Sequence, residues 1–362
     1  MKIVHVVEPF ASGIAAFVQS IVQNLRDDYH IVIHGEREYV MRSTEIIKYF
    51  PDDNVQFIRW RSAQRSISVV KDTAALVELC KLLQKLKAQN MVDAVHLHSS
   101  KSGFLGRLAC RLMNIPNVIY TPNGAPFLLS KLNAVNFFYK LFEKLGSSFG
   151  GKVVCSSRSE QAAYRKLGIK ALNINNGIAV DASQYPPGEV PAATGKFRII
   201  TSARIVQQKD PVLFNTIATH FKDFEQFEFI WVGDGGERSV LTSPNITITG
   251  WLPQSEALEL INNSHLYLST SQYEGLSFSV LEALSLRKTV LLKNCIGNRD
   301  IVRKGLNGDL FSNAQEAILK IFQYYNNPAM LQVMGEYSGW LCQKEFNVDA
   351  TCLGYRNLYQ RV

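Results

Sequence analysis

The chain has 362 residues, of which 46% are hydrophobic and 19% charged, a balance that excludes a disordered protein. This length also excludes one ordinary core, and two domains of roughly 170 residues are expected. The 39 basic and 31 acidic residues give a net charge of +8, which favours acidic partners without choosing among nucleic acid, anionic lipid and sugar nucleotide. Nothing beyond this charge favours nucleic acid, and none is expected as a partner.

Cysteine usage and hydropathy bear on the compartment. The six cysteines form no C-x-x-C pair and show no metal-ligand spacing, which is typical of reduced thiols in a cytoplasmic protein. The first seven residues read as a strand and not as the apolar region of a signal peptide, and no uncharged apolar run reaches about 18 residues. We therefore expect a cytoplasmic protein without a spanning segment, for which a peripheral position on the inner face of the plasma membrane is a further option.

The first half of the chain alternates strands with helices. Residues 3–7 form an apolar strand, and a turn then leads into a helical pattern at 16–24, which is how a doubly wound α/β domain opens. Gly13 is the only glycine in that turn, where a G-x-G-x-x-G fingerprint needs three, so no dinucleotide cofactor is expected. Gly13 can still let the backbone approach a phosphate. Further strands are expected at 31–33, 55–58, 94–98, 119–121, 152–157 and 172–177, and helices at 72–86, 104–112 and 133–148.

Polar residues follow two of these strands. His96 and His98 point to one face at strand spacing, but the sequence places no third ligand beside them, so no metal site is expected. His98 stands at the carboxyl end of its strand, where open parallel sheets carry their ligands. Asn123 follows the next strand and reaches the same edge.

The helix expected at 133–148 is both aromatic and basic. It carries several phenylalanines together with Lys140 and Lys144, and Lys131 precedes it. This composition fits a helix that binds an anionic membrane surface, and it equally fits a core helix whose lysines extend to solvent.

A second domain follows a change in composition. Residues 181–196 are rich in proline, glycine and alanine without a periodic pattern, which predicts a linker between domains at 1–180 and 197–340. Residues 341–362 are expected to form a helical tail that packs back toward the first domain. Inside the second domain, strands are expected at 197–202, 229–232, 245–250, 265–270 and 289–292, with helices at 212–220 and, capped by Ser255, at 256–261.

The stretch from residue 269 to 284 has the pattern of a phosphate and sugar site. A turn at 273–275 follows a buried strand, and Ser277 stands where an N-cap should stand before a helix that begins at Phe278. The amino end of such a helix favours an anion. Arg204 and Lys209, five residues apart after the first strand of the second domain, can add two cations suited to a diphosphate. On this pattern Glu282 can accept hydrogen bonds from a ribose diol, and Glu274 from sugar hydroxyls.

Together these motifs resemble the retaining GT-B glycosyltransferases of glycosyltransferase family 4, which build many bacterial capsule, lipopolysaccharide and glycan chains. The matching pieces cover nearly the whole chain: His96 to Gly103 with Gly106-Arg107, Ile174 to Ile178, Ala203-Arg204 through Lys209-Asp-Pro, Val232 to Gly236, and Glu274 and Glu282 with seven residues between them. The resemblance implies a GT-B fold, in which two Rossmann-like doubly wound domains face each other across a cleft.

The resemblance also implies roles. Catalysis would involve Arg204 and Lys209 at the diphosphate and Glu274 at the transferred sugar. Donor contacts would come from Glu282 at the ribose and from the following further residues: Gly13, His98, Asn123, Gly275, Leu276, Ser277 and Phe278. It implies a nucleotide diphosphate sugar as donor substrate with no cofactor or metal, transfer of a hexose or N-acetylhexosamine with retention, and a glycan or polyprenyl-diphosphate-linked acceptor.

One departure from the family pattern leaves alternatives open. The family usually has His-Gly after Thr-Pro, where this chain has Asn123-Gly124, and Asn can hydrogen-bond a sugar but carries no charge. Asn123 therefore keeps a non-catalytic sugar-nucleotide-binding subunit beside the transferase. A nucleotide-sugar 2-epimerase is kept as a second enzyme of the same fold.

Overall fold

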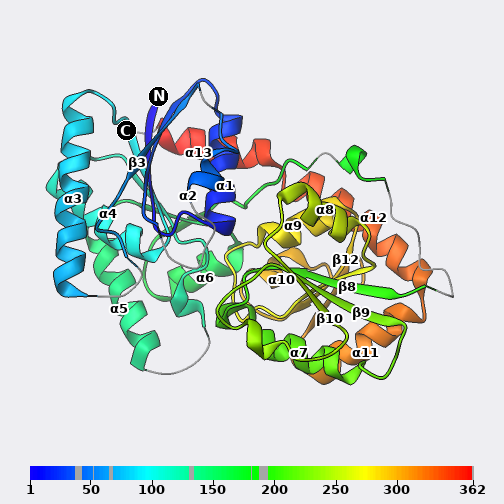
Figure 1. The fold of residues 1–362 in the computed structure, drawn as a ribbon. Helices are drawn as coiled ribbons and strands as arrows, with labels where there is room; N and C mark the ends of the chain where they lie inside the picture. The colour runs from blue at the N-terminus through cyan, green and yellow to red at the C-terminus, as the bar shows by residue number, and fades with distance from the viewer. Residues whose placement is uncertain are drawn as a thin grey trace. The chain divides into compact units, whose positions relative to one another are not determined.

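The computed structural model describes residues 1–36, 43–51, 53–64, 68–129, 134–180, 182–186 and 195–360. Contacts divide the chain into two compact units, one made of Met1–Asn176 with Val348–Val362 and the other of Gly177–Asn347 (Figure 1). The chain end from residue 348 onward thus belongs to the first unit, whereas residues 341–347 of the expected tail belong to the second. Of the expected linker, residues 182–184 form a short 3-10 helix, and residues 181 and 187–194 lie outside the described residues.

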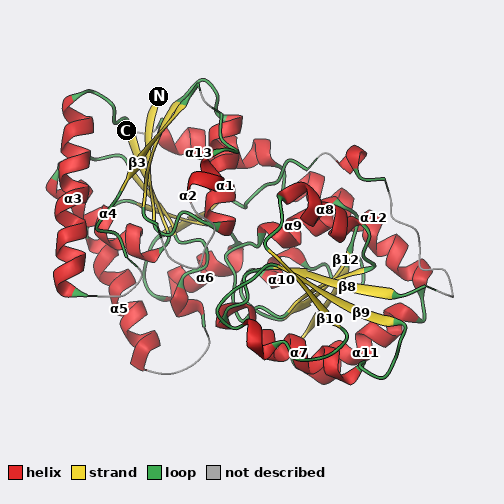
Figure 2. Cartoon of the chain, viewed as in Figure 1, coloured by secondary structure: helices red, strands yellow, loops and turns green. Residues whose placement is uncertain are grey.

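The first unit is built on a parallel sheet of seven strands in the order β3-β2-β1-β4-β5-β6-β7. Most of its strand residues are buried, the histidines among them, because helices flank the sheet and cover its faces (Figure 2). The strand order reverses between β1 and β4, which is where doubly wound sheets bind ligands. The strands are β1 (Lys2–Val7), β2 (Tyr29–His34), β3 (Val55–Arg59), β4 (Ala94–His98), β5 (Val118–Thr121), β6 (Lys152–Cys155) and β7 (Ala171–Asn173).

Three helices of this unit begin earlier than the sequence pattern predicts, and one of them is α3, which starts at Val69 and not at residue 72. Helix α1 starts at Ser12, so Gly13 lies in its first turn and not in the preceding loop. Helix α4 starts at Ser100, because Ser99 turns the chain with a φ of 70° and its carbonyl accepts the Gly103 amide at 2.8 Å. The helices are α1 (Ser12–Asn24), α2 (Ser43–Ile47), α3 (Val69–Ala88), α4 (Ser100–Leu112), α5 (Ala134–Ser148), α6 (Arg158–Lys166) and α13 (Val348–Tyr359), with a 3-10 helix at Pro126–Leu128.

The second unit repeats the plan with six parallel strands in the order β10-β9-β8-β11-β12-β13. The strands are β8 (Phe197–Ser202), β9 (Phe227–Val232), β10 (Ile246–Gly250), β11 (Leu266–Ser269), β12 (Thr289–Lys293) and β13 (Gly308–Phe311). The helices are α7 (Pro211–His220), α8 (Gln254–Asn262), α9 (Phe278–Ser285), α10 (Asn298–Ile301), α11 (Ala314–Tyr325) and α12 (Pro328–Glu345), with 3-10 helices at Gln207–Lys209 and Arg238–Val240. Two doubly wound parallel α/β units confirm the predicted fold class.

Sequence reasoning misplaced one helix start and missed one strand in this unit. Helix α8 begins at Gln254 after Pro253, so Ser255 lies inside the helix and is not its cap. Strand β13 was not predicted, although it pairs with β12 from Val290 to Lys293.

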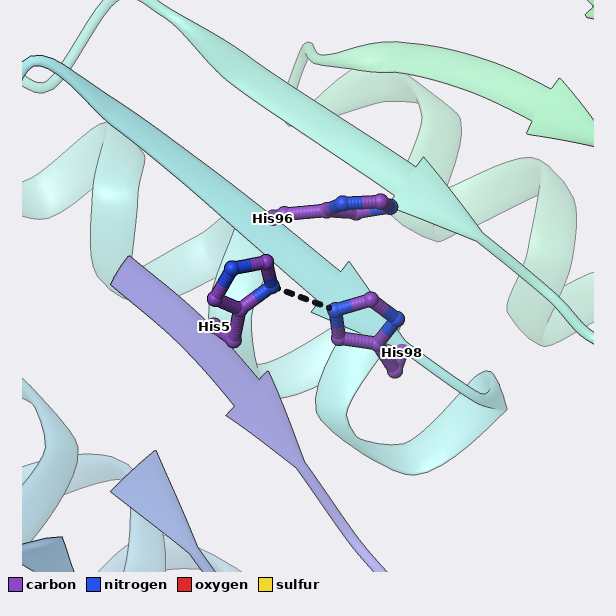
Figure 3. A group of neighbouring side chains, drawn as sticks. All are labelled: His5, His96 and His98. Atoms are coloured by element: carbon purple, nitrogen blue, oxygen red, sulfur yellow. Dashed lines mark hydrogen bonds between the residues drawn. The ribbon is translucent and has the colours of Figure 1, made fainter. Parts of the chain in front are cut away.

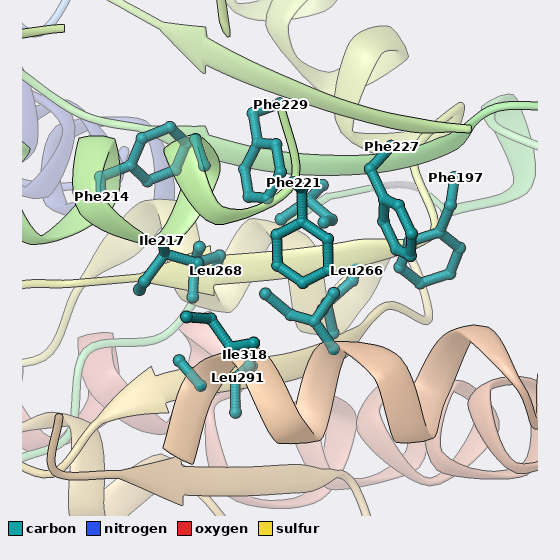
Figure 4. Packing of buried hydrophobic residues seen from close by; sticks show 14 of the residues in the cluster. Phe197, Phe214, Ile217, Phe221, Phe227, Phe229, Leu266, Leu268, Leu291 and Ile318 are labelled. Atoms are coloured by element: carbon teal, nitrogen blue, oxygen red, sulfur yellow. The ribbon is translucent and has the colours of Figure 1, made fainter. Parts of the chain in front are cut away.

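A large aromatic cluster anchors one face of the second sheet. Phe221 and Phe227 lie with ring centroids 4.5 Å apart, and Phe214 meets Trp231 edge to face at 4.9 Å. Leu266 of β11 joins the same cluster (Figure 4). This packing fixes the strands β8, β9 and β11, whose carboxyl ends carry the candidate site. Among the described residues, no helix combines the length and apolar character needed to cross a membrane.

Candidate functional site

Lys209 and Glu274 meet in an ion pair in the second unit. The Lys209 Nζ lies 2.5 Å from Glu274 Oε1, and the side chains are only 15% and 8% exposed. Lys209 ends the 3-10 helix that follows β8, and Glu274 lies in the loop after β11. The pairing brings together two of the predicted catalytic residues at the carboxyl edge of the sheet.

Backbone contacts hold these two loops against each other. Thr270 donates its hydroxyl to the Lys209 carbonyl at 2.7 Å, and the Gln272 amide donates to the Gln208 carbonyl at 2.8 Å. In return, Gln208 Nε2 donates to the Tyr273 carbonyl at 3.0 Å. The separation between the ammonium and the carboxylate is therefore set by the loops and not by two flexible side chains alone.

Arg204 lies in a segment that the glycine-containing loop after β9 holds in place, and this loop belongs to the motif from Val232 to Gly236. The Ile205 amide donates to the Asp234 carbonyl at 2.9 Å, and Trp231 Nε1 donates to the Ala203 carbonyl at 2.8 Å. A Cβ at Gly233 would lie 2.2 Å from the Ala203 oxygen. The glycines after β9 thus let that loop close on the segment that carries the half-buried Arg204.

A further lysine, missed in the sequence, lies near this edge. Lys293, at the end of β12, places its Nζ 2.8 Å from Asp210 Oδ2. Asp210 adopts a left-handed conformation with a φ of 52° and caps α7 by accepting the Leu213 amide at 3.2 Å. In the sequence, the Asp210-Pro211 pair at a helix start indicates that Asp210 caps the helix. It does not indicate which lysine pairs with the carboxylate.

Helix α9 begins at Phe278 with Ser277 in the N-cap position, as predicted, but the Ser277 side chain does not cap it. Its hydroxyl instead lies 3.1 Å from the Ser279 hydroxyl. Gly275 and Leu276 are buried before the helix, and Ser277 and Phe278 are half-buried. The predicted contacts of this segment with phosphate and sugar stay a prediction.

Glu282 lies on the same helix and is half-buried. Gln254 Nε2 donates to its Oε1 at 2.9 Å, and burial raises the pKa of Glu282 to about 7. Tyr267 lies close by: it donates to the Ser279 hydroxyl at 2.9 Å, and burial raises the pKa of Tyr267 to about 12. A carboxyl with a pKa near 7 is partly protonated at neutral pH, so its capacity to accept hydrogen bonds depends on pH.

Gly297 determines how closely the neighbouring loop approaches Glu274. It adopts a φ of 88°, and a Cβ there would lie 2.7 Å from the Glu274 Cβ and 2.8 Å from the Gly275 oxygen. The Glu274 amide donates to the Ile296 carbonyl at 3.0 Å. Only glycine fits this position without displacing Glu274.

In the first unit, Gly13 and Asn123 lie at carboxyl ends of strands. Gly13 is exposed in the first turn of α1, the helix that follows β1 after a short loop. Asn123 is half-buried and left-handed, with a φ of 55°, which its short amide side chain tolerates. The turn is held by Glu160, whose Oε1 accepts the Gly124 amide at 2.9 Å.

Glu160 itself was overlooked in the sequence. It is wholly buried, and its Oε2 accepts the amide and the hydroxyl of Ser156 at 3.0 and 3.2 Å. Burial raises the pKa of Glu160 to about 7. This carboxyl ties the segment after β6 to the turn that carries Asn123.

His98 lies inside the first unit and not on a surface open to a ligand. Its side chain is wholly buried, and its Nε2 lies 3.1 Å from His5 Nδ1 (Figure 3). His5 Nε2 lies 3.0 Å from His30 Nδ1, and His30 Nε2 donates to the Leu25 carbonyl at 3.2 Å. Because that last bond fixes the tautomers along the chain of rings, His98 Nε2 donates and its Nδ1 carries the lone pair. The expected direct contact with a donor therefore conflicts with this buried position.

The sequence places no third potential ligand beside His96 and His98, but the structure brings His5 next to them. The three buried rings can present nitrogens within 4.8 Å of one another. His96, however, uses Nδ1 with the Tyr359 hydroxyl at 2.7 Å and Nε2 with the Thr121 hydroxyl at 2.8 Å. Burial lowers the pKa of His5 and His96, and that of His98 to about 3, so the cluster packs as neutral rings.

Comparison with solved structures assigns the fold. Sucrose-phosphate synthase from Thermosynechococcus elongatus superposes with a TM-score of 0.79 at 14% identity, covering 100% of this chain and 99% of that one. HepE from Anabaena, in complex with UDP and glucose, gives 0.77 at 16% identity and covers both chains fully. At such low identity these likenesses define the fold alone, which is the GT-B fold.

Sequence families assign the class. Residues 12–175 match the family described as glycosyl transferase 4-like domain, and residues 187–339 match glycosyl transferases group 1. The chain therefore belongs to the glycosyltransferases, as the resemblance of its motifs predicted.

Two bacterial relatives are similar over most of their length. One is the UDP-Gal:alpha-D-GlcNAc-diphosphoundecaprenol alpha-1,3-galactosyltransferase of Escherichia coli, 25% identical over 85% of this chain and 84% of that protein. The other is the N,N'-diacetylbacillosaminyl-diphospho-undecaprenol alpha-1,3-N-acetylgalactosaminyltransferase of Campylobacter jejuni, 22% identical over 82% of each chain.

Proposed function

We propose that this glycosyltransferase moves a hexose or N-acetylhexosamine from a nucleotide diphosphate sugar to a glycan or polyprenyl-diphosphate-linked acceptor in surface polysaccharide or glycoconjugate synthesis. The observation that carries the proposal is the Lys209–Glu274 pair, which sets a cation and an acceptor side by side at the edge of the second sheet. The names of the two bacterial relatives support the choice of a lipid-linked acceptor.

On this proposal Lys209 and Arg204 neutralise the departing diphosphate. Fixed positive charge stabilises a leaving group most when it is in place before the bond breaks, and a loop-held lysine meets that condition. A diphosphate that takes the Lys209 ammonium releases the Glu274 carboxylate to accept hydrogen bonds from sugar hydroxyls. These cations supply the charge that a metal would otherwise supply, so we propose catalysis without one.

Other residues would orient the donor. Glu282 accepts hydrogen bonds from the ribose diol, and the backbone from Gly275 to Phe278 lies against sugar and phosphate. In the first unit, Gly13 admits a phosphate and Asn123 hydrogen-bonds the sugar. His98 contributes from inside, by holding the end of β4, because its buried ring makes no direct contact in the geometry described above.

The proposed reaction retains the anomeric configuration. The acceptor hydroxyl oxygen forms the new bond to the anomeric carbon on the face from which the diphosphate leaves, and the hydroxyl proton passes to a diphosphate oxygen. No separate base is needed. The α-linked products named for the relatives are those that retention from an α-linked nucleotide sugar would give.

A screen of nucleotide sugars tests the proposal. We expect one base and sugar to raise the melting temperature of the wild type, and incubation of that donor with a polyprenyl-diphosphate-linked sugar to give an α-linked product by NMR. Conversion of the donor without acceptor would favour a 2-epimerase. Donor binding with neither transfer nor donor hydrolysis would favour a non-catalytic binding subunit, for which Asn123 is the motivating residue. Either result overturns the proposed transfer.

A further inference from the structure

Helix α5 presents its apolar side to solvent and its polar side to the protein. Six large apolar side chains on it are between 37% and 65% exposed, and we call them the outward face: Val135, Phe137, Phe138, Leu141, Phe142 and Leu145. The buried positions are Asn136 and Glu143, only 7% and 4% exposed, and Gly146. A helix that packs on a soluble domain normally has the opposite arrangement.

Specific contacts fix this orientation. Glu143 Oε2 lies 3.4 Å from Arg107 Nη2, and Glu143 Oε1 accepts the Tyr120 hydroxyl at 2.8 Å. Gly146 gives Arg107 its room, because a Cβ there would lie 2.3 Å from Arg107 Nη2. Asn136 Nδ2 donates to the Leu129 carbonyl at 2.7 Å. Rotating the helix to bury its apolar side would leave a buried charge without its partner, which is strongly unfavourable.

The outward face is contiguous at helical spacing, since Phe138, Leu141, Phe142 and Leu145 are three, four and seven residues apart and lie on one side of a helix. Single exposed apolar residues are ordinary on a protein surface, but a continuous group of this kind marks an interaction site. Helix α5 lies beside α4 (Figure 1), and Phe104 of α4 meets Phe142 edge to face with ring centroids 5.4 Å apart.

The charges around this face indicate its partner. Within α5 the only acidic residue is Glu143, which is buried and paired, whereas Lys144 is exposed and Lys140 half-exposed. Arg111 is exposed and donates to the Ser148 carbonyl at 2.9 Å, at the end of the helix. Aromatic and aliphatic side chains flanked by lysines, without exposed acids, suit the interface of an anionic bilayer.

We propose that α5 docks the protein on an anionic membrane surface through its outward face, with Lys140 and Lys144 at the lipid phosphates. The docking is inferred from α5 alone. Only its consequence rests on the proposed function: the docked enzyme would meet a lipid-linked acceptor at the bilayer.

Co-sedimentation with vesicles tests the docking in the full chain without nucleotide sugar. We expect the wild type to bind vesicles of phosphatidylcholine with a quarter phosphatidylglycerol at least tenfold better than pure phosphatidylcholine. The double variant Lys140→Ala/Lys144→Ala should bind more than tenfold more weakly, since each lysine near an anionic surface contributes about fivefold. The triple variant Phe138→Ser/Leu141→Ser/Leu145→Ser should lose binding by at least tenfold.

Matched variants control for a general change in surface hydrophobicity. Leu319 and Val333 in the second unit are 60% and 70% exposed, and the variant Leu319→Ser/Val333→Ser should bind vesicles like the wild type. Because all substituted α5 residues are exposed or half-exposed, melting temperatures should stay close to that of the wild type.

Three outcomes would overturn the docking: no wild-type preference for anionic vesicles, equal binding by the wild type and both α5 variants, or a wild-type dimer that the α5 variants dissociate. The last would assign the outward face to a second copy of the chain. Transfer to a short water-soluble acceptor, measured separately, should be unchanged in the α5 variants. Failure of the wild type in that assay contradicts the proposed function and leaves the docking result standing.

Discussion

Lys209 is the residue whose proposed role can be tested most directly by a single substitution. Its Nζ lies 2.5 Å from Glu274 Oε1, and in the proposed reaction the departing diphosphate takes the place of that carboxylate as the partner of the ammonium. We expect Lys209→Ala to lower the turnover number about a hundredfold, which is the usual cost of losing one preorganised charge-stabilising donor. Steady-state kinetics with the donor selected by the screen measures this.

A control for Lys209→Ala is available in the same unit. Lys320 Nζ lies 3.0 Å from Asp309 Oδ2, a carboxylate whose side chain is 5% exposed, so Lys320→Ala likewise removes the cation from a buried acid. Its turnover number should stay near that of the wild type. Equal losses in both variants would mean that Lys209 acts through stability alone, and near-normal turnover in Lys209→Ala would exclude the role proposed for it.

Glu282 makes donor affinity depend on pH. Because burial raises its pKa to about 7, the carboxyl is mostly protonated below pH 7 and mostly ionised above it. The ionised form offers two acceptor oxygens to a ribose diol, whereas the protonated form must use one oxygen as a hydrogen-bond donor. Affinity for the intact nucleotide sugar should therefore rise between pH 6 and pH 8, by up to about tenfold per pH unit below the pKa.

The variant Glu282→Gln isolates this effect, because a diphosphate esterified at both ends does not titrate in that range. Calorimetric titrations of the variant should give weaker binding with a flat pH profile. A wild-type profile that is equally flat, or a variant profile that keeps the slope, would contradict the ribose contact.

Residue types and spacing predicted part of this site and missed the rest. Lys209 and Glu274 were predicted because each follows a strand of one sheet, and parallel strands bring their carboxyl ends to the same edge. His98 satisfied the same rule, yet it lies wholly buried among other rings. Sequence position places a residue at an edge but does not say whether its side chain turns inward, because that depends on His5 and His30, which are distant in sequence.

At the scale of elements, Gly297 links the loop before α10 to the loop of Glu274. We expect Gly297→Ala to reduce the turnover number more than tenfold, because the new Cβ would lie 2.7 Å from the Glu274 Cβ and must displace it. Gly305→Ala is the matched control: Gly305 is also left-handed, with a φ of 74°, but no atom lies within 4 Å of its added Cβ. Both variants carry the backbone cost of about 1 kcal/mol, and only the first carries the clash.

Activity and thermal melting of the two variants separate these contributions. The same loss of turnover in both would assign the effect to backbone strain and would remove the argument that Gly297 positions Glu274. A loss confined to Gly297→Ala would support it.

Sequence patterns predicted the elements better than their ends. Strands such as β12 were recognised from short apolar runs, because a parallel strand is buried on both faces of its sheet. The start of α4 at Ser100 was missed because it depends on the left-handed Ser99, a residue type that seldom adopts that conformation. Strand β13 was missed because Gly308-Asp-Leu-Phe311 is short and carries a buried aspartate, whose charge is met by Lys320 and by the Tyr324 hydroxyl.

At the scale of the whole molecule, the chain end completes the first unit. Helix α13 packs against α1, and its Tyr355 and Tyr359 are wholly buried. The Tyr355 ring stacks on His96 with centroids 5.0 Å apart, and its hydroxyl lies 3.1 Å from that of Thr121. The first 176 residues therefore lack part of their core until residues 348–359 have been synthesised. The first unit begins first in the chain but can be completed only after the second unit has been synthesised.

A substitution in α13, near the end of the chain, should therefore destabilise the first unit. Tyr355→Ala should lower the free energy of unfolding of the first unit by about 3–5 kcal/mol, the range for removing a large buried ring, and leave the second unit unchanged. Leu353→Ala on the same helix removes a side chain that is 61% exposed and should cost within about 0.5 kcal/mol. Hydrogen exchange resolves the two units: peptides from β1 and β4 should lose protection in Tyr355→Ala, and peptides from β8 and β9 should keep it. Equal loss in both sets would mean that the units unfold as one, and unchanged protection in β1 would contradict the place of α13 in the core of the first unit.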